Sequence, residues 1–74
     1  MRRLIGEQEF MQDIVSRLKE ERESRGLTIK DVAERCGVHR ARLSEIEHGR
    51  ANLTLSWLFR ISRALGIELE IKFN

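Results

Sequence analysis

The chain has 74 residues, of which 41% are hydrophobic and 35% charged, and its formal net charge is +2. A chain this short forms one domain that buries only about 60% of the surface its unfolded form exposes, so a second copy would add stability. No run is apolar enough to cross a membrane and the basic start lacks the apolar core of a signal peptide, so we expect a cytoplasmic protein. The single cysteine excludes an internal disulfide, which agrees with a reducing compartment.

The spacing of apolar residues predicts an all-α chain with four helices. Phe10, Ile14 and Leu18 recur every four residues, which indicates a first helix over residues 7–25. Glycines follow the helices, because a glycine just past a helix end enters the left-handed conformation at little cost. The other helices are expected over residues 28–36, 39–48 and 54–65, in a single domain that covers residues 1–74.

The segment around Gly37 predicts two short helices joined by a tight turn. Thr28 can cap the first of them, with Asp31 three residues later in the position of a capping box. Gly37 supplies the left-handed turn, and His39 opens the second helix. This arrangement is a helix-turn-helix of the kind that reads DNA.

The second helix of this motif is expected to bury one side and expose the other. Leu43 and Ile46 occupy inward positions together with Val38. Small and polar side chains on the opposite side are free for a DNA groove, where they can contact base edges. These side chains are Arg40, Ala41, Ser44 and Glu45.

Charge is distributed unevenly along the chain. Residues 1–25 carry six positive and six negative side chains, whereas residues 38–63 carry five arginines against Glu45 and Glu47. The local surplus suits a polyanion, although charge on a small helical protein is more often only a solvated face. The five arginines are Arg40, Arg42, Arg50, Arg60 and Arg63.

The apolar pattern changes period at the end of the chain. Apolar residues alternate with charged ones over residues 67–73, which predicts a half-buried strand. Since no other segment alternates this clearly, the expected pairing partner is the same strand of a second chain, and the alternative is a frayed end. The residues expected at the dimer interface are Phe59, Ile67, Leu69, Ile71 and Phe73.

Several motifs occur in the order and spacing of a known family: Arg22, Gly26-Leu27-Thr28, Val32-Ala33-Glu34, Gly37-Val38, Ile46-Glu47-His48-Gly49 and Ile61-Ser62-Arg63-Ala64-Leu65-Gly66. On these residues the chain, from about Ile14 to Gly66, resembles the Cro/C1-type helix-turn-helix family, also called the Xre family. The resemblance implies a lambda-repressor-like domain of four or five helices. It also implies a homodimer that binds a palindromic operator in double-stranded DNA, with the third helix in the major groove. Most such proteins are transcriptional repressors, so we expect a nucleoid-associated protein.

The resemblance also assigns roles to individual positions. Arg22 and Glu47 match a structural ion pair between the first and third helices. Ile29 stands where the family commonly has a glutamine that binds phosphate, a contact that isoleucine cannot make. Arg42 is ambiguous between reading a base and holding a phosphate. The base-reading positions are His39, Arg40, Ala41, Ser44 and Glu45, and the phosphate positions are Thr28, Lys30, Arg42, His48 and Arg50.

The last third of the chain resembles one subgroup of this family. Residues 52–55, 58–61 and 65–71 are similar to the HipB-type antitoxins of HipA-kinase toxin-antitoxin pairs, in which a terminal strand pairs across the dimer. This similarity implies autoregulation and a HipA-like kinase toxin as partner. One alternative is a protein-interaction module that masks a partner and binds DNA weakly or not at all. Another is a phage-type repressor or restriction-modification controller, many of which close with a further helix.

Two patterns look like chemical sites, but the residues favour neither. Cys36 and His39 have the spacing of a metal-binding pair and His48 adds a third group, yet a structural zinc site normally has four ligands. Ser44, Glu47 and His48 contain the groups of a hydrolytic set, but neighbours on a helix point in different directions. We therefore expect no metal, no cofactor, no catalytic residue and no enzymatic activity.

Overall fold

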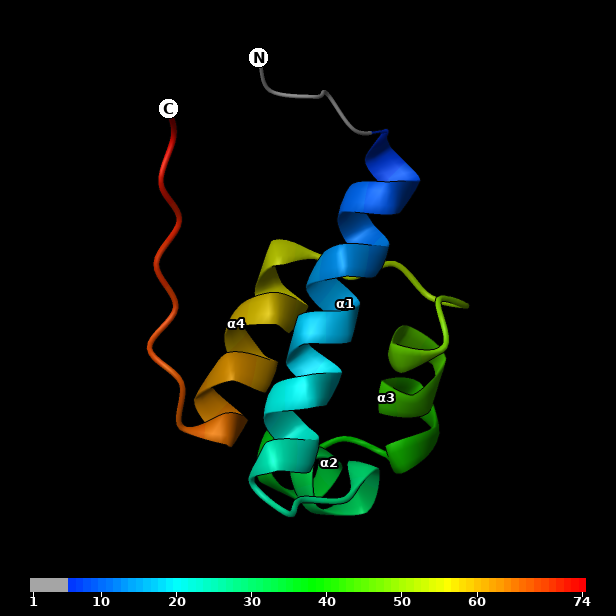
Figure 1. Cartoon of the computed structure of the whole chain (residues 1–74). Helices are drawn as coiled ribbons and strands as arrows, with labels where there is room; N and C mark the ends of the chain where they lie inside the picture. Colours follow the sequence, from blue (N-terminus) through cyan, green and yellow to red (C-terminus); the bar gives the residue numbers. More distant parts are fainter. Residues whose placement is uncertain (1–5) are drawn as a thin grey trace.

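The computed structural model describes residues 6–74, and this part of the chain is all-helical (Figure 1). Its helices begin and end within one residue of the predicted ranges, because the outermost predicted residues are caps rather than helical residues. None of these helices is long and apolar enough to cross a bilayer. The four helices are α1 (Glu7–Ser24), α2 (Ile29–Cys36), α3 (Arg40–Glu47) and α4 (Leu55–Leu65).

Local hydrogen bonds set where α2 and α4 begin. The Thr28 hydroxyl accepts from the Asp31 backbone N–H at 3.0 Å, and the Asp31 carboxylate accepts from the Thr28 N–H at 2.8 Å, which completes a capping box. The Thr54 hydroxyl accepts from the Trp57 N–H at 3.1 Å. Each cap satisfies backbone donors that the first turn of a helix leaves without partners.

The core lies where α2, α3 and α4 meet, and α1 packs across α3 and α4. Leu18 of α1 contacts this core. Phe10, which the predicted apolar stripe of the first helix included, is instead 51% exposed. The first turns of α1 extend beyond the other helices, so this part of α1 has little to pack against (Figure 1). The buried apolar residues are Val32, Ala33, Leu43, Ile46, Ile61 and Leu65.

The predicted strand over residues 67–73 is not formed in this single chain. After Gly66 the chain turns back and continues in extended form, without strand structure within the described residues (Figure 1). The Ile67 N–H donates to the Ser62 carbonyl at 2.9 Å, whereas residues 68–74 make no backbone hydrogen bond within residues 6–74. A strand is defined by its pairing partner, and the described chain offers none. We refer to residues 67–74 as the tail.

Candidate nucleic-acid interface

The turn between α2 and α3 fixes which side of α3 faces outward. Gly37 ends α2 in the left-handed conformation, with φ of 71°, and the Val38 N–H donates to the Ala33 carbonyl at 3.0 Å. Leu43 and Ile46 are then fully buried against the core. Because these two residues hold the inner side of α3, the side chains on its other faces point away from the core. Among the predicted base-reading residues of this helix, Arg40, Ala41 and Glu45 are exposed and Ser44 is half-buried.

His39 caps α3 with its ring. Its Nδ1 accepts from the Ala41 backbone N–H at 3.2 Å, so Nδ1 carries no proton in this arrangement. The ring proton of a neutral histidine then sits on Nε2. His39 is exposed, and it therefore offers one N–H donor to a neighbouring molecule. Such a donor matches an acceptor on a base edge or a phosphate oxygen.

His48 lies at the other end of α3 and contacts Ser44. Its Nδ1 is 2.7 Å from the Ser44 carbonyl oxygen, which can only accept, so Nδ1 is the donor. The same nitrogen is 3.3 Å from the Ser44 hydroxyl. The predicted phosphate residue His48 thus hydrogen-bonds to the predicted base-reading residue Ser44.

Four of the cations predicted to contact DNA are exposed. Lys30, Arg40, Arg42 and Arg50 are exposed, and none has an ion pair within residues 6–74. The two arginines of α1 and the arginine that caps it differ, because each of them pairs with a carboxylate: Arg17 with Asp13, Arg22 with Glu47 and the cap Arg25 with Glu21. These four cations are therefore free to pair with an anionic ligand, although α2 and α3 also carry carboxylates.

Several predicted DNA contacts line one shallow depression between α2 and α3. Lys30, His39 and Arg40 contribute to its wall, and its volume is about 410 Å³. Glu34 lies on the same wall, so the depression is not uniformly basic. Ile29, near the start of α2, packs against the core and is not among the residues that line this depression.

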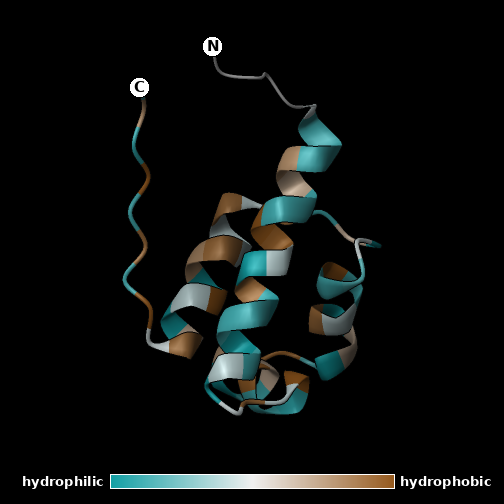
Figure 2. Cartoon of the chain, viewed as in Figure 1, coloured by the Kyte–Doolittle hydropathy of each residue, from teal (hydrophilic) through white to brown (hydrophobic). Residues whose placement is uncertain are grey.

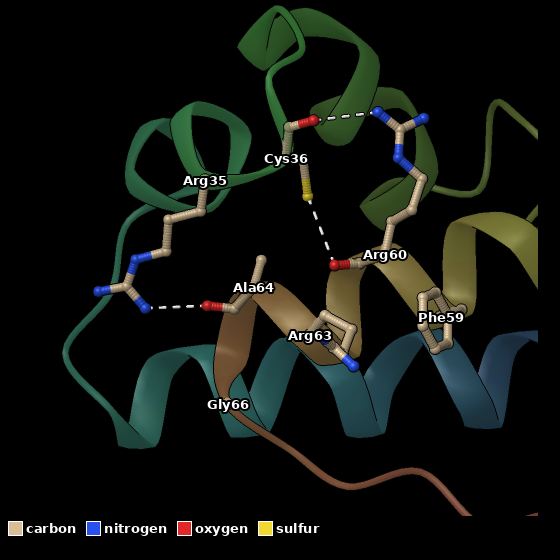
Figure 3. Close-up of a pocket in the computed structure, with 7 residues that line it drawn as sticks. All are labelled: Arg35, Cys36, Phe59, Arg60, Arg63, Ala64 and Gly66. Atoms are coloured by element: carbon tan, nitrogen blue, oxygen red, sulfur yellow. Dashed lines mark hydrogen bonds between the residues drawn. The ribbon is translucent and has the colours of Figure 1, made fainter.

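Two arginines of the predicted basic surplus lie apart from α3. Arg60 and Arg63 line a second depression of about 540 Å³ together with Arg35 of α2, and none of the residues lining it belongs to α3 (Figure 3). Arg35 donates to the Ala64 carbonyl at 2.9 Å, and Arg60 donates to the Cys36 carbonyl at 3.0 Å. These hydrogen bonds link α2 to α4. The count of charges along the sequence did not predict this role, and no local sequence pattern indicates it.

Cys36 belongs to this second depression. Its thiol donates to the Arg60 carbonyl at 3.7 Å, and the residue is half-buried. Burial raises the pKa of the Cys36 thiol above its ordinary value, despite the opposing charge of Arg60. The thiol therefore behaves as a packing group between α2 and α4. Residues 6–74 contain no group of three or more His, Cys, Asp and Glu residues that could hold a metal ion.

Most of the residues predicted at the dimer interface are exposed. Phe59 on α4 is 56% exposed and Phe73 in the tail is 95% exposed. Leu69 and Ile71 are also exposed, whereas Ile67 is half-buried and packs against the core. Leu55, which the sequence did not place in this set, lies four residues before Phe59 and is exposed as well.

Comparisons with known proteins agree with this geometry. A family model described as helix-turn-helix matches residues 18–72, a span that contains α2, α3 and α4. The chain is also similar to an uncharacterized HTH-type transcriptional regulator from Methanothermobacter thermautotrophicus. The two sequences are 43% identical over 51 residues, which is 69% of this chain and 74% of the archaeal protein.

Proposed function

Since the chain belongs to the Xre class of the helix-turn-helix family, we propose that it is a sequence-specific repressor that binds a palindromic operator as a dimer. The observation that carries this proposal is the outer side of α3. Leu43 and Ile46 anchor the helix in the core, and Arg40 stands at its first turn, exposed and without an ion pair within residues 6–74. A rigidly held helix with a free polar side is what insertion into the major groove requires.

Each predicted contact has a distinct chemistry. The Arg40 guanidinium can donate two hydrogen bonds to O6 and N7 of a guanine, and Ala41 can touch a thymine methyl group. His39 offers its Nε2 proton to an acceptor. Ser44 and Glu45 complete the proposed reading surface. The residues proposed to contact phosphates are Thr28, Lys30, Arg42, His48 and Arg50. Arg42 could contact a base edge instead.

Dimerisation is proposed to occur through the tail and α4. Phe59, Leu69, Ile71 and Phe73 expose apolar surface that a second copy would cover. Burying one such side chain contributes about 1.5 to 3 kcal/mol before the cost of ordering is subtracted. Ile67, already half-buried, would continue the same surface. A dimer also places two copies of α3 on one face of the duplex, as a two-fold operator requires.

Selection from a random duplex pool tests the proposed DNA binding. Duplexes recovered by the protein should converge on an inverted repeat, which should bind at least about 1000-fold more tightly than a shuffled duplex at physiological salt. Affinity for both duplexes should fall steeply as salt is raised, because phosphate contacts release counterions. Equal affinity for the selected and the shuffled duplex would contradict the proposal.

A more specific proposal is that the repressor is the antitoxin of a toxin-antitoxin pair with a HipA-like kinase. The exposed tail supports it, because an apolar segment outside the core is available to a protein partner as well as to a second copy. In this case the neighbouring gene should encode a kinase-like protein that forms a complex with this chain when the two are expressed together. If instead the chain binds such a partner but no duplex selectively, the partner-masking function replaces the repressor.

A further inference from the structure

The tail carries a charge pattern that distinguishes among the ways in which two tails can pair. Figure 2 shows the alternation of hydrophobic and hydrophilic residues along it. We infer one antiparallel register for the two tails, an inference that rests on the proposed dimer. In it, Ile67 faces the partner's Phe73, Leu69 faces the partner's Ile71, Glu68 faces the partner's Lys72, and Glu70 faces its own copy on the two-fold axis.

The backbone of the tail points to a second copy as its occupant. The Ile67 N–H is already bonded to the Ser62 carbonyl of α4. Backbone groups of successive residues in an extended chain point to opposite sides, so those of the even-numbered tail residues point away from this contact. They make no backbone hydrogen bond within residues 6–74. The partner strand would therefore bond at Glu68, Glu70 and Lys72, and the odd-numbered residues would form the pairs in which side chains approach most closely.

Alternation restricts the possible registers. Residues that face each other across two strands share one side of the sheet, so a slip of one residue would place apolar side chains on the polar side. Only slips by two residues keep apolar facing apolar. The inferred register is the one in which all four apolar residues of the tail face apolar residues of the partner.

Charge disfavours one neighbouring register, and the loss of an apolar pair disfavours the other. A slip by two in one direction places Glu68 opposite the partner's Glu70 in both halves, and like charges directly opposite are destabilising. A slip by two in the other direction places Glu70 opposite the partner's Lys72, leaving Glu68 without a facing cation and Ile67 outside the apolar pairs. In the chain itself Lys72 Nζ is 3.6 Å from Glu70 Oε1. The inferred register adds the partner's Glu68 on the other side of Lys72, so that each lysine lies between two carboxylates.

The same register gives Phe73 a place to pack. Facing Ile67, the partner's Phe73 would lie beside Gly66, where the depression between α2 and α4 meets the tail (Figure 3). Phe59 lines this depression, and the Arg63 guanidinium lies 5.5 Å from the centre of the Phe59 ring. An aromatic ring with a cation beside it suits a second aromatic side chain. Phe73, the most exposed large apolar residue among residues 6–74, would thereby be covered.

A charge swap in the full-length protein tests the register. Glu68→Lys and Lys72→Glu should each weaken dimerisation about tenfold, as measured by sedimentation equilibrium, because each change places like charges opposite each other twice per dimer. The double variant, which exchanges the two charges, should restore the dissociation constant to within about threefold of the original. Glu70→Gln should leave the dimer as tight or tighten it, because it removes two facing carboxylates from the axis.

Other outcomes would overturn the register. A Glu68→Lys variant that leaves the dimer unchanged while Lys72→Glu weakens it would show that Glu70 rather than Glu68 faces Lys72. A double variant that stays as weak as Lys72→Glu would contradict the inferred register. A wild-type chain that remains monomeric at all concentrations would reject tail pairing altogether. Binding of each variant to a duplex with a single half-site reports separately on α3, so loss of the register and loss of the proposed DNA binding are distinguishable.

Discussion

Arg22, in the last turn of α1, forms a two-pronged ion pair with Glu47, the last residue of α3. Its Nε and Nη2 donate to the two carboxylate oxygens of Glu47 at 2.9 Å each, and both side chains are only 11% exposed. Its Nη1 donates to the Leu27 carbonyl at 2.7 Å. One guanidinium thus holds the end of α3, the end of α1 and the loop before α2 in fixed positions.

Removing the charge of Glu47 should destabilise the whole domain. In Glu47→Gln the Arg22 guanidinium stays largely buried without its counter-charge, which should lower the free energy of unfolding by about 3 kcal/mol, the lower end of the range for breaking a buried pair. This is a large share of the roughly 4 to 11 kcal/mol expected for a 74-residue domain. Urea unfolding measures the change.

Asp13→Asn is the matched control for Glu47→Gln. It breaks the ion pair between Asp13 and Arg17, whose side chains are 52% and 73% exposed, and should change the stability by less than about 0.5 kcal/mol. Equal losses in the two variants would mean that the Arg22–Glu47 pair contributes no more than a surface pair.

The capping box of α2 should make stability depend on pH. The hydrogen bond from the Thr28 backbone N–H, and next that with the Thr28 side chain, hold the pKa of Asp31 below its ordinary value of 3.8. A carboxyl whose pKa is lower in the folded state stabilises the fold above its unfolded-state pKa, and this contribution is lost as the pH falls through the folded-state pKa. Asp31→Asn should therefore lower the melting temperature at pH 7, and its difference from the wild type should shrink below about pH 4.

Thr54→Ala provides the comparison for this titration. It removes the hydroxyl that caps α4, which should cost about 1 kcal/mol. Because a hydroxyl does not ionise in this range, the cost should be similar at pH 7 and pH 3. A loss for Asp31→Asn that is equally independent of pH would contradict the proposed role of its carboxylate.

The proposed dimer predicts a fixed distance between half-sites. Two copies of α3 should enter successive major grooves about one helical turn apart, roughly 34 Å. Inserting five base pairs between the half-sites moves one of them to the other side of the duplex, so affinity should fall to that of a single half-site. Fluorescence anisotropy with the original and the expanded operator measures this. Unchanged affinity would indicate that each chain binds independently.

Features that depend on near neighbours in the chain were predictable from the sequence. Thr28, Thr54 and Gly37 act on backbone groups within four residues, so the helix ends follow from local chemistry. The inward positions of Leu43 and Ile46 follow from helical spacing. The residues of α3 that do not face inward must face outward, and these are the candidate reading residues.

Features that depend on distant or absent neighbours were not predictable. The arginine surplus divides between two surfaces because Arg60 bonds to the Cys36 carbonyl, 24 residues away, which a count of charges cannot reveal. Phe10 matches the apolar stripe of α1 but is exposed, since the first turns of α1 extend beyond the other helices (Figure 1). The alternation of the tail predicts a strand, whereas strand formation requires a partner backbone that residues 6–74 do not supply.

Arg40 and Arg50 provide a comparison between reading and holding DNA. Both are exposed arginines without an ion pair within residues 6–74, but Arg40 begins α3 and Arg50 lies in the loop after it. Arg50→Ala should weaken binding to all duplexes about equally and reduce the salt slope by about one. It is the control for loss of charge alone.

The most direct test of base reading by α3 is the affinity of Arg40→Ala for a set of operators that differ at one base pair. The wild type should prefer one base at a single position of each half-site by about 1 to 3 kcal/mol, and Arg40→Ala should lose that preference while the other positions keep theirs. A uniform loss of affinity at every position, like that expected for Arg50→Ala, would contradict the assignment of Arg40 as a reader of DNA sequence.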